Sequence, residues 1–325
     1  MRINNNHAFC SYSVLFIFLA SIFPAAVLAQ RPIPLAADSE EIEVLPVQGN
    51  ISMIATGGSN IAVMTGNLGL IVVDSGNIEA SAFVVDAIQK LSVYPPRYIV
   101  NTSALPGHLA GNEAISSIGE PLPSNGGADI AGLGIPIVGH VNSLSVLLNA
   151  FADELPYEFW PNNTFFGARK ALYLNGEAIE MIYQPAALTD SDIMVHFRKS
   201  DVLVTGDIFD TTSYPHFYTE LGGSLQGVID ALNQVIDITV PEFNQQGGTL
   251  IIPGHGRISS ESDVVEYRDM LTIIRDRVQS MIDTGLSFEQ ILAMQPSLEY
   301  DGIYGNDSGE WTTSMFLEAV YEDLR

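Results

Sequence analysis

Hydrophobic residues in the first half of the chain form short runs and then one longer helical pattern. Two glycine-containing pairs, Gly57-Gly58 and Gly66-Asn67, separate the short runs, as hairpin turns do. The predicted strands are Ile51–Ala55, Asn60–Thr65 and Leu68–Asp74. Apolar residues then recur at helical spacing from Ala80 to Leu91. The short apolar run Tyr98–Val100 predicts a buried strand that leads into a loop.

The second half of the chain repeats this order of elements. Further strands are predicted at Ala171–Leu174, Ile179–Tyr183, Ile193–Phe197, Val202–Thr205 and Thr249–Ile252. Helical spacing predicts helices at Leu225–Ile238, Ser262–Thr284, Phe288–Met294 and Thr312–Leu324. Hairpins followed by strand–helix units, twice over, predict two mixed sheets packed face to face with helices outside. The expected fold is therefore α/β (α+β), a four-layer αββα sandwich.

The N-terminal segment has the pattern of an export signal. An apolar run from Val14 to Ala29 follows Arg2 and ends in small residues before Gln30. We expect a signal peptide at residues 1–29, a tether at residues 30–45, and one domain at residues 46–325 with a C-terminal helical extension. The expected location is the periplasm or the outside medium, and a retained N-terminal anchor is the alternative. The single cysteine, Cys10, lies inside the leader.

Charge narrows the range of partners. The 325 residues include 38 acidic and 13 basic side chains, which gives a net charge of -25. This field repels nucleic acid and anionic lipid. We expect no nucleic-acid partner and no stable membrane span after leader removal, and we expect a small-molecule ligand or substrate.

Four motifs occur in a recognisable order. They are Leu68–Gly76, Tyr98–Asn112, Val202–Phe209 and Ile251–Gly256, and they contain Asn-Thr, Gly-Asp and Pro-Gly-His-Gly sequences. In order and spacing, residues 45–260 resemble the metallo-β-lactamase superfamily. The segment from Trp311 to Tyr321 looks like the closing helix of exported bacterial members. The resemblance implies a metallo-β-lactamase-like sandwich and a hydrolase with two metal ions that activate a shared hydroxide.

Most metal ligands that the resemblance implies are absent. The family motif His-x-His-x-Asp-His is followed by a later His, a bridging Asp and a final His. The three histidines of the first metal correspond to Ser103, Leu105 and Leu188, and an aspartate of the second metal corresponds to Gly107. Leucine cannot coordinate a metal. The two-metal chemistry of the family is therefore not expected here.

Three family ligands remain, namely His108, Asp207 and His255. Two histidines and a carboxylate can hold one divalent metal with open positions, and we expect at most one ion, zinc, bound weakly. Each of the three residues also has a purely structural alternative. We assign no catalytic residue and expect the trio to converge at one edge of the sandwich.

Two functional hypotheses follow. The first is a pseudoenzyme that binds a small molecule or partner, and the substitutions to leucine and glycine favour it. The second is a mononuclear metal-dependent hydrolase of an ester, thioester, lactone or amide, which the retained trio favours. The remaining histidines of the domain, His140, His196 and His216, are assigned no chemistry.

Overall fold

The computed structural model describes residues 42–122, 134–240 and 248–325, all within the unit Leu35–Arg325. The expected signal peptide lies outside these residues, as does most of the expected tether. The last three tether residues, 43–45, belong instead to the first strand, β1. Within the described ranges, none of the helices combines the length and apolar character that a membrane span needs.

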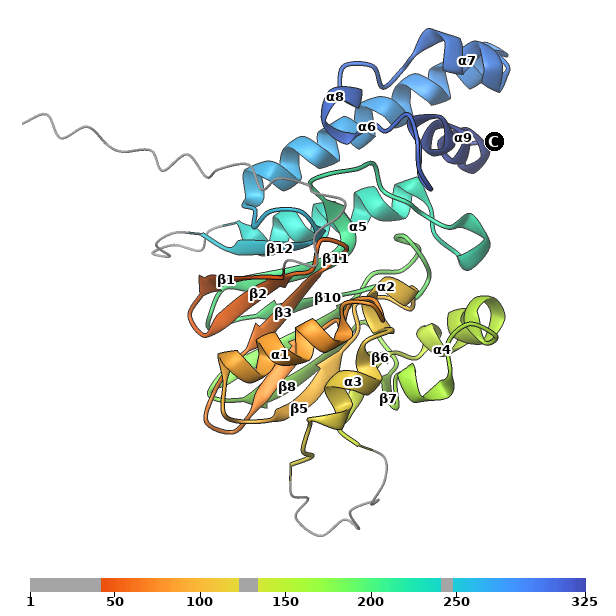
Figure 1. The fold of residues 1–325 in the computed structure, drawn as a ribbon. Coiled ribbons are helices and arrows are strands. Elements are labelled where there is room, and N and C mark those ends of the chain that lie inside the picture. The colour runs from red at the N-terminus through yellow and green to blue at the C-terminus, as the bar shows by residue number, and fades with distance from the viewer. Residues whose placement is uncertain (1–41, 123–133, 241–247) are drawn as a thin grey trace, which may run out of the picture. The chain divides into compact units, whose positions relative to one another are not determined.

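The first sheet contains seven strands in sequence order, and its first four are antiparallel (Figure 1). The last four are mutually parallel. The strands are β1 (Glu43–Gln48), β2 (Ile51–Ala55), β3 (Asn60–Met64), β4 (Leu70–Val73), β5 (Pro96–Val100), β6 (Ile137–His140) and β7 (Asn163–Phe165). The predicted strands in this half are confirmed, whereas β1, β6 and β7 were not predicted. Pro46 interrupts the pattern of β1, and proline is tolerated there because β1 lies at the sheet edge.

The second sheet has five strands in the order β12-β11-β10-β9-β8. They are β8 (Arg169–Leu174), β9 (Glu177–Tyr183), β10 (Ile193–Phe197), β11 (Val202–Asp210) and β12 (Leu250–His255). Strands β11 and β12 are parallel, and the other neighbours are antiparallel. Strand β11 runs past the predicted end at Thr205 because it stays beside β12 through two register shifts. This extension places Asp207 next to the end of β12.

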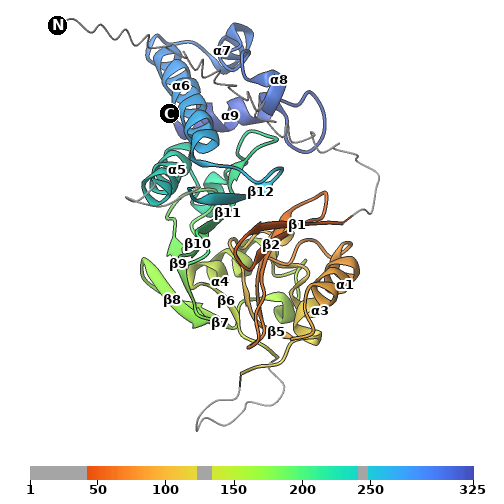
Figure 2. The ribbon, with the colours of Figure 1, turned by 90° about the vertical axis from the view of Figure 1, so that its left-hand side faces the viewer.

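Helices cover the outer faces of both sheets (Figures 1 and 2). Helices α1 (Ser81–Leu91) and α3 (Asn112–Ser117) share a hydrophobic cluster with the first sheet. Helices α5 (Leu225–Thr239), α6 (Glu261–Asp283) and α9 (Thr313–Asp323) share another with the second sheet. A third cluster draws on both sheets and fills the space between them. The predicted αββα sandwich is therefore confirmed.

Local sequence explains where the C-terminal helices begin. Ser260 and Asp263 form a capping box at the start of α6, and Ser287 and Gln290 form another at the start of α7 (Phe288–Met294). Shorter helices that lack a long apolar pattern were not predicted. They are α2 (Pro106–Leu109), α4 (Asn142–Val146), the π-helix Leu147–Phe151, the 3-10 helices Tyr157–Phe159 and Thr219–Leu221, and α8 (Asp301–Tyr304).

Candidate functional site

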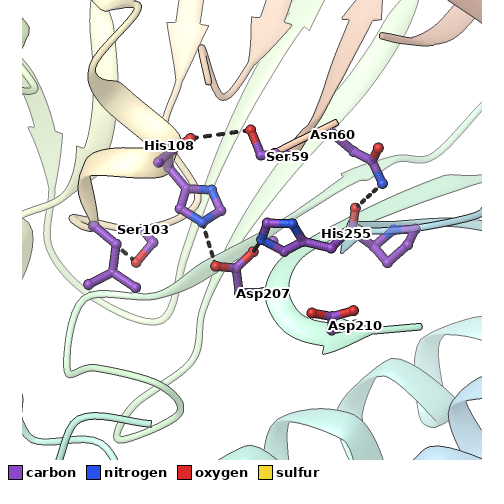
Figure 3. Close-up of polar contacts among 12 residues, drawn as sticks. Ser59, Asn60, Ser103, His108, Asp207, Asp210 and His255 are labelled. Carbon is purple, nitrogen blue, oxygen red and sulfur yellow. Dashed lines mark hydrogen bonds and ion pairs between the residues drawn. The ribbon is translucent and has the colours of Figure 1, made fainter. Parts of the chain in front are cut away.

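The three candidate ligand residues lie together, as expected, although they come from three separate segments (Figure 3). His108 is in α2, just after β5, Asp207 is in the extended part of β11, and His255 ends β12. Nε2 of His108 lies 2.9 Å from Oδ2 of Asp207, and Nε2 of His255 lies 3.2 Å from Oδ1. The site therefore joins the first sheet to the second. Metal binding by these residues stays a prediction.

Two carboxylates hold His108 from opposite sides. Its Nδ1 lies 3.0 Å from Oδ2 of Asp74, and the side chain is only 2% exposed. Asp74 follows β4 in a left-handed conformation, with a φ of 64°, and it accepts hydrogen bonds from the backbone nitrogen and hydroxyl of Thr102. Burial lowers the pKa of His108, but the charges of Asp207 and Asp74 outweigh burial and hold it well above its usual value. His108 is therefore an imidazolium between two carboxylates.

Asp207 also pairs with His255, which is partly exposed. Burial raises the pKa of Asp207, but the two histidines outweigh it and hold the pKa well below the usual range. Burial lowers the pKa of His255, and Asp207 overcomes this and raises it to about 8. The contact with His255 is ionic, because Oδ1 of Asp207 has no well-directed hydrogen bond. A Cβ at Gly254 would lie 2.0 Å from this oxygen, so glycine is what permits the close approach.

The hairpin of β2 and β3 makes hydrogen bonds to the backbone near both histidines of the site. Nδ2 of Asn60 donates to the carbonyl oxygens of Pro253 and Gly256, each at 3.0 Å, and so holds the turn that carries His255. The hydroxyl of Ser59 donates to the carbonyl oxygen of Gly107 at 3.3 Å, beside His108 (Figure 3). The hairpin therefore fixes the backbone on either side of Asp207.

As these side chains stand, they do not fit a metal ion. A metal needs ligand atoms that converge on one point about 2 Å from each. Here His108 and His255 contact different oxygens of the same carboxylate. In the part of the chain that the structure describes, no group of three histidine, cysteine, aspartate or glutamate side chains is arranged to hold a metal. The trio forms a network of ion pairs in place of a ligand cluster.

The residues at the positions expected to lack first-metal ligands make other contacts within the protein. Ser103 donates its hydroxyl hydrogen to Oδ1 of Asp192 at 2.8 Å. Leu188 is 1% exposed and shares a hydrophobic cluster with residues of α5 and α6, and Leu105 is 8% exposed. By contrast, Gly107 is exposed, and a Cβ there would meet nothing within 4 Å. Among these four positions, open space for a side chain is therefore found at Gly107.

Two buried carboxylates at this edge were missed from the sequence. Asp74 holds His108, and Asp192 accepts from the backbone nitrogen of Thr189 at 2.7 Å as well as from Ser103. Burial raises the pKa of Asp192 to about 6, although these hydrogen bonds oppose the shift. The available signal was their place in the chain, since Asp74 directly follows the buried strand β4 and Asp192 directly precedes the buried strand β10.

The other histidines lie in separate surroundings. His140 ends β6, is buried, and stacks on Tyr183 with ring centroids 3.8 Å apart. His196 lies in the middle of the second sheet, opposite Glu180 of β9. His216 lies in the loop after β11, between the rings of Tyr218 and Trp311.

No protein-family model and no curated protein matches the sequence. Among solved structures, a double mutant of the sec-alkylsulfatase PisA1 has a TM-score of 0.66 at 15% identity, over 86% of this chain and 50% of that chain. The stereoselective inverting sec-alkylsulfatase Pisa1 from Pseudomonas sp. has a TM-score of 0.62 at 13% identity over the same shares. The chain thus spans about half the length of these alkylsulfatases.

Two β-lactamases match over nearly their whole length. The metallo-β-lactamase from Pontibacter korlensis has a TM-score of 0.56 at 15% identity, over 71% of this chain and 99% of that chain. The DIM-1 metallo-β-lactamase has a TM-score of 0.54 at 18% identity, over 71% and 97%. At such identities the likeness concerns the fold alone. With its two mixed sheets and outer helices, this chain has the metallo-β-lactamase fold.

Proposed function

We propose that this protein is a pseudoenzyme of the metallo-β-lactamase fold, which binds a small organic molecule and does not hydrolyse it with a pair of metal ions. The observation that carries the proposal is the pair of contacts that Asp207 makes with the two histidines. One of its oxygens contacts His108 and the other contacts His255, so the bridging ligand of the family links two side chains here.

The surroundings of the trio support the same proposal. Ser103 is bound to Asp192, and Leu188 is buried in the core, so two first-metal positions contribute to protein stability. To bind a metal, His108 would have to give up its contacts with two carboxylates, although its side chain is only 2% exposed. The loss of these contacts opposes metal binding. In addition, a site with few charged ligands offsets less of the free energy that desolvation of the metal ion costs.

Metal content and hydrolysis test this proposal directly. The purified protein is expected to hold at most one equivalent of zinc and to lose it on dialysis against a mild chelator. Ester and lactam hydrolysis should stay at the background rate with added zinc, because no side chain at Gly107 accepts a proton from a bound water. Elemental analysis and a chromogenic hydrolysis assay give the answer. Two tightly held metals with zinc-dependent turnover would overturn the proposal.

A mononuclear metal hydrolase is the second candidate, and the contact between Asp74 and His108 favours it. A carboxylate on one ring nitrogen is the usual means of orienting a metal-ligating histidine through the other nitrogen. Here Asp74 occupies Nδ1, and Nε2 faces Asp207. The open space at Gly107 lies next to this arrangement in the chain.

Replacement of Gly107 by aspartate separates the two candidates. If the trio is half of a metal site, Gly107→Asp supplies the missing carboxylate and should tighten zinc binding by roughly tenfold or more, since even outer partners of a metal are worth 10- to 100-fold. Calorimetric zinc titration measures the change. Gly302→Asp is a matched control, because a Cβ at Gly302 also meets nothing within 4 Å. Equal zinc affinity in both variants and the unmodified protein would remove the hydrolase candidate and leave the pseudoenzyme.

A further inference from the structure

Three aromatic rings form a stacked column that the candidate site does not use. The ring of His216 lies 3.8 Å from Trp311 at an interplanar angle of 14°, and 4.1 Å from Tyr218 at 24°. His216 and Tyr218 belong to the loop after β11, whereas Trp311 comes from the segment before α9. All three side chains are partly exposed. The C-terminal helical extension therefore contributes a ring to a loop that begins near Asp207.

The middle ring of this column has a free polar edge. Nδ1 of His216 lies 3.1 Å from the hydroxyl of Tyr218, and Nε1 of Trp311 donates to the carbonyl oxygen of Tyr214 at 3.2 Å. Nε2 of His216 has no hydrogen-bond partner among the residues that the structure describes, and this atom is not fully buried. Burial raises the pKa of Tyr218 to about 12, so the phenol keeps its proton, and the tautomer of His216 decides whether the phenol donates to Nδ1 or accepts from it. A neutral imidazole with Nδ1 as acceptor carries its proton on Nε2.

The backbone of the column contacts Leu188, the position at which the resemblance implies a histidine of the first metal. The backbone nitrogen of Tyr218 donates to the carbonyl oxygen of Leu188 at 2.8 Å. A Cβ at Gly223 would lie 2.0 Å from the same carbonyl oxygen, so the loop is held tightly against this residue. Asp207 is near enough for its charge to act on both His216 and Tyr218. The backbone of the column is thus tied to the residue that stands where the resemblance implies a histidine.

We propose that the aromatic column, Tyr218, His216 and Trp311, is a binding subsite for a neutral small organic molecule that carries a flat apolar group and a carbonyl oxygen. The proposal rests on the pseudoenzyme function and specifies its ligand. Aromatic side chains bind flat apolar groups through their faces and edges. In the tautomer in which Tyr218 donates to Nδ1, Nε2 of His216 carries the proton that a carbonyl oxygen requires.

Charge selects a neutral ligand over an anionic one. The carboxylates of Asp207, Glu220 and Glu310 all act on Tyr218 and favour its protonated form. An anionic group at the column would meet the same negative field. A cationic group would be attracted by these carboxylates, but it could not accept the hydrogen bond that His216 offers. An amide, ester or ketone satisfies both conditions.

Saturation-transfer NMR on the full chain tests the subsite with two matched probes. Phenylacetamide has a flat ring and a neutral carbonyl, and phenylacetate has the same ring with an anionic group. Phenylacetamide should bind with a Kd of about 1 mM, a typical value for a weak fragment. Phenylacetate should bind at least about fivefold more weakly because of the carboxylates.

Two variants locate the binding. His216→Phe keeps a ring in the column but removes the donor, and it should weaken phenylacetamide binding by about threefold to tenfold, the equivalent of one neutral hydrogen bond. Tyr218→Phe removes the hydroxyl that orients His216 and should weaken binding in the same direction. His196→Phe, in the middle of the second sheet, is the matched control and should leave affinity unchanged. Thermal unfolding checks that each variant folds. If the His216 variant does not fold, phenylacetamide binding to the Tyr218 variant tests the subsite alone.

Three outcomes would overturn the subsite: no binding of phenylacetamide, equal affinity in the folded variants and the unmodified protein, or tighter binding of phenylacetate. None of them depends on metal content or hydrolysis. The subsite can therefore fail while the pseudoenzyme stands, whereas two tightly held metals with turnover would overturn the pseudoenzyme whatever the probes show.

Discussion

Replacement of Asp207 by alanine is expected to lower the free energy of unfolding by about 3–5 kcal/mol, the usual cost of removing one partner from a buried ion pair. The variant leaves His108 buried with a proton on Nε2 that has lost its acceptor, while Asp74 still holds the other side of the ring. It also removes the contact by which the β5–α2 segment is tied to β11 and β12. For a domain of this size the melting temperature should fall by roughly 10 °C.

Thermal and urea unfolding with and without a chelator measure this effect. Asp86→Ala removes an exposed ion pair with Lys90 on α1 and is the matched control, expected to change stability by less than about 0.5 kcal/mol. If the trio works as a metal-free link, the chelator should not change the melting temperature of the unmodified protein. A chelator effect as large as that of Asp207→Ala would show that a metal holds the two sheets together.

The fold could be predicted because its signals are local. Strand β2 and helix α7 have the predicted ends, since turn glycines bound the strand and a capping box begins the helix. Strand β11 was cut short because nothing in its own sequence encodes the continued pairing with β12. Strand β6 was missed because four buried residues are too few to establish a period.

The site was only partly predictable, because its residues meet across long stretches of chain. The motifs predicted that His108, Asp207 and His255 are neighbours, since the resemblance assigns each of them to a ligand position. They did not reveal that two histidines would share one carboxylate, which depends on the close approach of Gly254 to Asp207. The stacking of Trp311 on His216 joins the C-terminal extension to the loop after β11, and no periodicity or motif spans that separation.

Asp192 gives the last prediction, because its buried carboxylate should make stability fall as pH rises. Its pKa is about 6 in the folded protein against 3.8 for an unperturbed aspartate, and burial is the main cause. Between these values the folded state binds more protons than the unfolded state, so this contribution to stability decreases as pH increases. The full difference is about 3 kcal/mol, at 1.36 kcal/mol per pKa unit, and most of it develops between about pH 4 and pH 7. Asp207 has the opposite sign, because its lowered pKa stabilises the folded state above the unfolded pKa and the benefit is lost in acid.

Asp192→Asn isolates this contribution, because asparagine stays neutral and can still accept from Thr189 and bond to Ser103. The stability of the variant relative to the unmodified protein should rise by about 2 kcal/mol between pH 4 and pH 6.5, whatever its offset at pH 4. Urea unfolding at several pH values measures the difference, and Asp86→Asn, at an exposed position, serves as the control. A difference that stays flat across this range would mean that Asp192 is as easily ionised in the folded protein as in the unfolded chain. The hydrogen bonds from Ser103 and Thr189 would then fully offset the free energy that burial of the Asp192 charge costs.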